Sequence, residues 1–347
     1  ILITEEPVQI TGRFYGLATI IQRVKDQDDK FEIIHFNKVS KEFDGPKEVV
    51  RIPQVLADLN NIARSTNHEI EKSPLNLAGW YVYGAKDTKD IFTVQAIEPR
   101  ALMRLEPDEV ILGVDAGLNY IQHKNWKDTE IQKGASKTVL IDPSSSQSQD
   151  AISSWQEGDR AIVIHLYGGI GGDKKDERRF LGLVTGHFAY GVASVIRDSF
   201  TDDLRFDIEY QQVYAHNSDG IVSGPIKWFS YMGDLQQGWL GNRPVSDVVI
   251  KFSPVTQDYQ FGEIKLSPLT ELMWQLRIMM ARYRIGDGTG AAIVTPARSC
   301  AQDSNQALYL ALQKIEKNVN TDPNIQAWLK SHPNHPQTLR FQQRSEE

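Results

Sequence analysis

The chain has a single cysteine, Cys300, at a position where a nucleophile could be activated. Ser299-Cys300-Ala301-Gln302 forms a capping box, whose serine N-cap and glutamine three residues later predict the start of a helix. Cys300 would lie in the first turn, where free backbone N–H groups and the helix dipole stabilise a thiolate, and Arg298 adds a positive charge. The same N–H groups could hold the oxyanion of an acyl-transfer intermediate. The alternative is a small, apolar, buried cysteine.

Two histidines are candidates to assist Cys300. His187 opens an apolar strand after a glycine, which suits a general base that meets a helix start across a cleft. His216 ends the next strand and could accept the ring N–H of His187, with Asn217, Asp207 and Glu209 as alternative orienting groups. Alternation puts Asp207 and Glu209 on one face of that strand and His216 on the other. Taken alone, His187 could equally be a satisfied residue at a strand end.

The first third of the chain carries strand patterns. Runs rich in β-branched and aromatic residues cover 8–24, 30–36, 79–85 and 90–99, and a short helix is expected at 55–63. We therefore expect an antiparallel β-barrel or sandwich domain at 1–110, followed by a connecting segment at 111–150 that ends in the polar stretch DPSSSQSQD.

The remainder is expected to form an α+β domain at 151–325 and a polar, frayed or linking tail at 326–347. Strands are predicted at 161–167, 181–196 and 206–216. Apolar residues at helical spacing predict one helix at 271–285 and a second that starts at Ser299. These elements would carry Cys300 and the two histidines.

Composition narrows the classes of function. The net charge of −7 comes without a basic run, so nucleic acid is not an expected partner. No apolar stretch approaches the length of about 20 residues that spans a bilayer. One cysteine and eight scattered histidines predict neither a disulfide nor a metal site, and no cofactor is expected. The chain starts at Ile1 without methionine, which predicts a mature product after signal-peptide removal or a piece of a longer protein.

Three short motifs lie in the expected α+β domain: Glu157-Gly158-Asp159 before a strand, a Gly-His pair at 186–187 that opens a second strand, and VYAHNSDGIV at 213–222 that closes a third. Together they resemble the NlpC-type branch of the papain-like cysteine hydrolases. In most members the cysteine helix precedes the strands, so the resemblance implies a circularly permuted form. It also implies Cys300 as nucleophile, His187 as general base and His216 as the orienting residue.

A second resemblance involves GTGAAIVTPARSCAQDSNQALYLAL, at 288–312. It is similar to a segment of cyanobacterial and plant membrane proteins labelled as CAAX-type proteases. The membrane-embedded glutamate and histidine region behind that label has no counterpart here, so its metalloprotease activity does not transfer. The resemblance implies an extramembrane portion, in the periplasm or thylakoid lumen, with a membrane domain of the same protein as a possible partner.

These observations lead to one expectation and one rival. We expect an α+β fold in which an N-terminal antiparallel β-barrel precedes a circularly permuted papain-like domain that acts as a cysteine-dependent amide hydrolase or acyltransferase. Its substrate would be a peptide, peptidoglycan-like or acyl compound, with Tyr190, Asn217 and Trp239 as binding residues. The rival is a non-catalytic binding or sensing ectodomain of a membrane protein.

Overall fold

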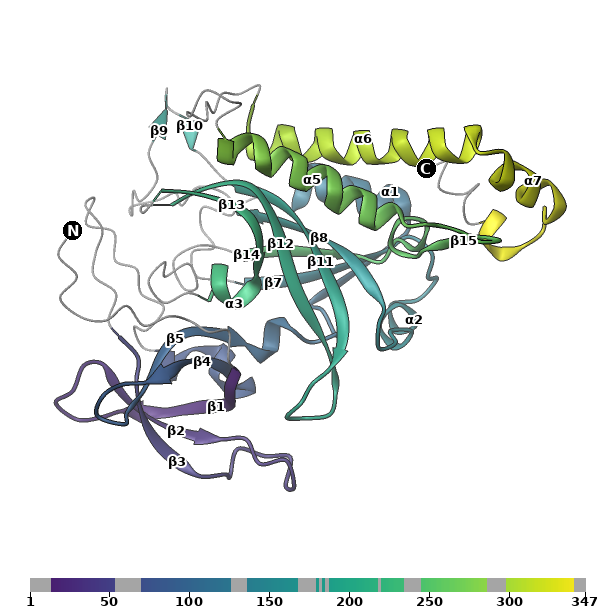
Figure 1. Ribbon diagram of the computed structural model, residues 1–347. Coiled ribbons are helices and arrows are strands. Elements are labelled where there is room, and N and C mark those ends of the chain that lie inside the picture. Colours follow the sequence, from purple (N-terminus) through teal and green to yellow (C-terminus); the bar gives the residue numbers. More distant parts are fainter. Residues whose placement is uncertain are drawn as a thin grey trace.

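The structure, a computed structural model, describes residues 14–53, 70–125, 136–167, 179–180, 183–184, 187–217, 220–233, 245–285 and 298–339. The chain has a mixed α and β architecture in which a small barrel lies against a larger sheet (Figure 1). Helices cover the other face of that sheet. The helix expected at 55–63 and Trp239 lie outside the described residues.

A closed five-stranded barrel forms the N-terminal part, in the order β1-β2-β3-β5-β4. The predicted barrel is confirmed, but it is not wholly antiparallel, because β3 pairs with β5 in parallel. Alternation buries Phe31 and Ile33 inside it while neighbouring positions stay partly exposed. Its strands are β1 (Phe14–Arg23), β2 (Lys30–His35), β3 (Lys47–Arg51), β4 (Trp80–Lys86) and β5 (Phe92–Pro99). Short 3-10 turns accompany them: η1 (Ile70–Lys72), η2 (Pro74–Ala78) and η3 (Arg100–Leu102).

The larger sheet has seven strands in the order β13-β12-β11-β8-β14-β7-β6. Neighbours pair antiparallel except β14 with β7 and β7 with β6, which are parallel. The strands are β6 (Glu109–Leu112), β7 (Ser136–Asp142), β8 (Arg160–Tyr167), β11 (His187–Arg197), β12 (Leu204–Asn217), β13 (Gly220–Lys227) and β14 (Val245–Ile250).

The segment expected to connect two domains, 111–150, is part of this sheet instead. It supplies the end of β6 and all of β7, because the apolar run Val139–Ile141 pairs with β14 and is fully buried. Between these strands lie α1 (Val114–Asn119) and the π-helical turn η4 (Tyr120–Lys124). The polar stretch after β7 turns into a short helix, α2 (Ser148–Ser153).

Two long helices, α5 (Pro268–Ile285) and α6 (Cys300–Thr321), cover one face of the sheet (Figure 1). The expected polar tail includes a further helix, α7 (Pro323–Ser331), because Asp322 caps its start and Ile325 is buried against β15 (Tyr259–Phe261). The remaining elements are short: α3 (Trp228–Tyr231), α4 (Ser253–Thr256), β9 (Arg179–Phe180), β10 (Leu183–Val184) and β16 (Ile264–Leu266). None of the described helices has the length and apolarity needed to span a bilayer.

The barrel and the sheet share one continuous hydrophobic core, and a second core lies between the sheet and α5 and α6. The barrel also meets the segment after α3 through its backbone, where Ile97 N–H donates to the carbonyl of Gly233 at 3.0 Å. A Cβ atom on Gly233 would lie 1.8 Å from the Ile97 oxygen. Glycine at this position therefore permits the close approach of the two layers.

Candidate functional site

Cys300 is the first residue of α6, as the capping box predicts, and the Ser299 hydroxyl accepts the N–H of Gln302 at 3.3 Å. Burial raises the pKa of the Cys300 thiol above its usual value. Hydrogen bonds from the backbone of Phe188 and Ala301 favour the thiolate but only partly offset that burial. A raised pKa favours the neutral thiol, whereas an activated nucleophile needs a lowered one.

His187 lies at the start of β11, but its ring is on the other face of the sheet from α6. Its neighbour Phe188 packs in the core beneath α5 and α6, and alternation turns His187 toward the barrel side. There His187 is buried, its Nε2 donates to Oε1 of Gln212 at 2.6 Å, and its ring lies 6.2 Å from that of Tyr231 in α3. The sheet therefore separates His187 from Cys300, and the predicted pair does not come together.

The other predicted site residues divide into two groups. Tyr190 is buried under α6, where its hydroxyl donates to Oδ1 of Asn305 at 2.8 Å and burial raises its pKa to about 12. Tyr190 therefore braces the helix against the sheet. His216 and Asn217 lie at the end of β12, where their backbones pair with Ile221 and Gly220, and their side chains are outside the described part.

A buried polar cluster that the sequence reading did not single out lies at the centre of the sheet. The Asp247 carboxylate of β14 accepts the hydroxyl of Tyr210 at 2.6 Å and contacts Nδ1 of His165 at 2.7 Å. All three side chains are almost fully buried. The signal in the sequence is a charged or titratable residue inside an apolar strand, as in AIVIHLY and VSDVVI.

This cluster has the geometry in which a carboxylate orients an imidazole. His165 pairs in register with Asp247 across β8 and β14, so both side chains point to the barrel side. The ring of His187 lies 6.1 Å from that of His165 on the same face. Because the barrel and α3 cover this face, the hydrogen bonds hold the central strands together under a shared core.

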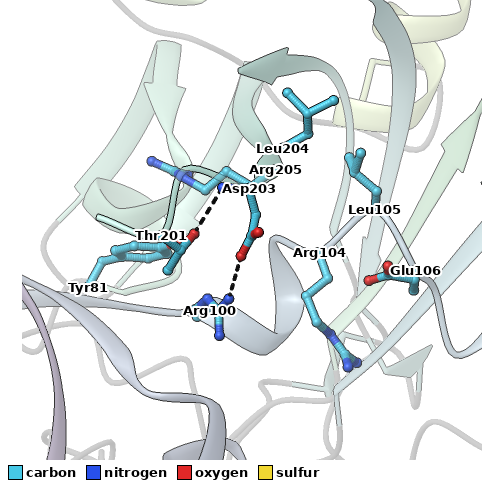
Figure 2. Close-up of a pocket in the computed structure, with 9 residues that line it drawn as sticks. All are labelled: Tyr81, Arg100, Arg104, Leu105, Glu106, Thr201, Asp203, Leu204 and Arg205. Carbon is cyan, nitrogen blue, oxygen red and sulfur yellow. Dashed lines mark hydrogen bonds and ion pairs between the residues drawn. The ribbon is translucent and has the colours of Figure 1, made fainter. Parts of the chain in front are cut away.

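A pocket of about 420 Å³ opens between the barrel and the hairpin that joins β11 to β12. Figure 2 shows its lining, which combines three arginines with two acids and a few apolar or hydroxyl groups. The lining residues are Tyr81, Arg100, Arg104, Leu105, Glu106, Thr201, Asp203, Leu204 and Arg205.

The three arginines of the pocket differ in their partners. Arg205 is held by Asp198 at 2.9 Å, and its guanidinium lies 4.6 Å from the centre of the Tyr81 ring. Arg100 pairs with Asp203 at 3.1 Å, and the Asp203 side chain is 67% exposed. Arg104 is exposed, donates only to the Ala101 carbonyl at 3.0 Å and has no acidic partner among the described residues.

Behind the pocket, the charges are buried and paired. The Tyr81 hydroxyl donates to the Asp198 carboxylate at 2.6 Å. Burial acts to raise the pKa of Asp198. The bond from Tyr81, two backbone N–H groups and Arg205 outweigh that effect and hold the pKa below its usual value. Burial raises the pKa of Glu98 to about 7, because Arg205, 3.6 Å away, only partly offsets desolvation. Arg205 is therefore fixed in place by two acids from two layers of the fold.

Within the described ranges, no three side chains of His, Cys, Asp or Glu come together as a set of metal ligands. Comparisons with known proteins do not assign this chain to a family. No family model, no curated protein and no solved structure matches this chain.

Proposed function

We propose that this chain is a non-catalytic binding protein that holds a small anionic ligand in the pocket between the barrel and the β11–β12 hairpin. The observation that carries the proposal is the environment of the Arg104 side chain. Arg104 lines the pocket and is exposed, and its guanidinium has no carboxylate partner among the described residues. Arginine binds carboxylate and phosphate groups through paired N–H donors, so an unpaired guanidinium in a pocket favours such a ligand.

Arg100 supplies a second donor at the same site. Its ion pair with Asp203 joins it to a side chain that is 67% exposed, and exposed pairs contribute only about 0 to 1 kcal/mol. A ligand anion can therefore compete with Asp203 for Arg100. Arg205 is less available, since Asp198 and Glu98 hold it from behind.

The rest of the lining restricts the ligand further. Leu105, Leu204 and the Tyr81 ring provide apolar walls, while Glu106 adds a carboxylate without a described partner. The pocket is thus suited to a compact molecule with one anionic group for Arg100 and Arg104 and a hydroxyl or amine that donates to Glu106. A polyanion would meet repulsion from Glu106 and Asp203.

The cysteine-dependent hydrolase, its permuted papain-like fold and its extracytoplasmic location stay predictions. Two features favour the binding role over the hydrolase: the raised pKa of Cys300 and the position of the His187 ring across the sheet from α6. Assistance from His216 would still require its side chain to reach Cys300.

The test is a titration of the protein with inorganic phosphate and with a panel of monocarboxylates, at constant ionic strength, by calorimetry and by the midpoint of thermal unfolding. Binding should weaken tenfold or more in Arg104→Gln, because a hydrogen bond to a charged group contributes about 1.5 to 3 kcal/mol. Arg277→Gln is the matched control, since it removes another exposed arginine, far from the pocket in α5.

Both outcomes are informative. A selective loss in Arg104→Gln supports the pocket as the site. Equal responses of wild type and both variants would place anion binding elsewhere, and no response to phosphate or to any of the monocarboxylates would overturn the proposal.

A further inference from the structure

The outer face of α5 carries an exposed apolar stripe. Trp274 is 54% exposed, Ile278 41% and Ile285 61%, and they follow at spacings of four and seven residues. The opposite face, with Leu272, Leu276 and Met280, is buried against the sheet. The stripe is therefore a second, solvent-facing apolar surface on a helix whose core-facing side is already satisfied.

Basic side chains lie along this stripe. Arg277 and Arg284 are exposed on the same face, and Arg277 has no acidic partner among the described residues. Arg284 donates its Nε to the Ser223 carbonyl at 2.7 Å, which holds its guanidinium at the edge of the sheet.

The nearby acids are already engaged with other groups. Glu271, at the start of α5, pairs with Lys314 of α6 at 2.9 Å. Asp303 is buried and accepts the hydroxyl of Tyr283 at 2.6 Å. The outer face of α5 is thus apolar and positive within a chain whose net charge is −7.

From this arrangement we infer that the outer face of α5 docks on an anionic lipid surface. Tryptophan prefers the interface between headgroups and acyl chains, and isoleucines beside it can bury their side chains in the acyl boundary. Arg277 and Arg284 then lie at the level of the phosphates, where each basic residue adds attraction to anionic lipid.

Two other occupants fit this face less well. A second copy docked through the same face would bring Arg277 and Arg284 of both chains together, and the acid of α5, Glu271, already pairs with Lys314. An acidic protein segment would satisfy the arginines. It would leave a row of three large apolar side chains on a convex single helix without the groove that protein partners usually fill.

The face is also rigid enough to act as a unit. The hydrogen bonds from Tyr283 to Asp303 and from Arg284 to Ser223 fix the C-terminal half of α5 to α6 and to β13. Docking would therefore require no unfolding of the helix.

The experiment is sedimentation of the whole chain with vesicles of phosphatidylcholine, with and without phosphatidylglycerol. Partition should be detectable only with the anionic lipid and should decrease with added salt. Ile278→Ser combined with Ile285→Ser should abolish it, and Arg277→Gln should lower the partition coefficient about fivefold. Trp274 emission should shift to the blue on binding, and Trp274→Phe identifies that signal.

Matched control variants test whether partition depends on side chains of the outer face of α5 rather than on any exposed apolar or basic residue. Val39→Ser removes an apolar side chain that is 93% exposed in the barrel region, and Lys89→Gln removes an exposed basic side chain in the same region. Both should leave partition unchanged. Equal partition of all variants, partition without anionic lipid, or no partition would overturn the inference. Two other results would also overturn it. The first is binding of polyglutamate but not of vesicles, and the second is a dimer, detected by light scattering, that Ile278→Ser disrupts.

Discussion

Replacement of Glu98 with glutamine tests the charges that are buried between the barrel and the sheet. The Glu98 side chain is 3% exposed, accepts the Tyr83 hydroxyl at 3.3 Å and lies 3.6 Å from Arg205. Asp207 and Lys227 act on it from β12 and β13. Burial raises the pKa of Glu98 from 4.5 to about 7, and Arg205 lowers it only in part. Glutamine keeps the shape and removes the ionisation.

The direction of the effect follows from proton binding. The folded state keeps the Glu98 proton between about pH 4.5 and pH 7, whereas the unfolded chain releases it. The contribution of Glu98 to stability is therefore fully present below pH 4.5 and is lost as the pH rises through 7. A pKa difference of this size corresponds to a loss of about 2 to 3 kcal/mol between about pH 5 and pH 8.

Urea unfolding of wild type and Glu98→Gln at several pH values measures this loss. The free energy of unfolding of the variant, relative to wild type, should increase by about 2 to 3 kcal/mol from about pH 5 to pH 8. Glu106→Gln, at an exposed position of the pocket, is the control and should show no such trend. A constant difference between Glu98→Gln and wild type would refute the reasoning, because it would mean that Arg205 keeps Glu98 ionised throughout.

Three further predictions concern reactivity and packing. Cys300 should react slowly with iodoacetamide at neutral pH in the folded protein, because its pKa is raised. His187→Ala should leave the pH midpoint of that reaction unchanged, because the sheet separates its ring from Cys300. A midpoint below that of free cysteine would contradict the raised pKa. Gly233→Ala should lower the free energy of unfolding by about 1 to 3 kcal/mol in urea titrations, because its Cβ would meet the Ile97 carbonyl. Tyr210→Phe should cost about 1 to 3 kcal/mol by the same assay, since it removes a donor to the buried Asp247; no change would show that water replaces it.

Local chemistry was readable from the sequence. The start of α6 at Cys300 follows from its capping box, because a cap involves only four consecutive residues. The barrel strands and α5 follow from alternation and from helical spacing, which are also short-range patterns. The polar composition of 326–347 predicts a frayed tail, but Asp322-Pro323 is a good helix start and begins α7 just before it.

The register of β12 shows that strict alternation of side chains does not hold along the whole strand. A bulge between Gln212 and Ala215 puts two residues opposite one, so the strict alternation used to place His216 does not hold across it. Val213 and the neighbouring Tyr214 both pack in the core beneath α5 and α6.

Tertiary structure alone decided which side chains meet. Alternation shows that His187 and Phe188 lie on opposite faces of a strand, but it does not show which face receives α6. His165 and Asp247 are 82 residues apart and meet only because β14 inserts between β8 and β7. Arg100 reaches Asp203 only because the barrel docks on the hairpin after β11. Composition and local periodicity therefore determined the elements of this protein, whereas the order of strands in the sheet and the docking of its layers determined its site, because these depend on contacts between distant segments.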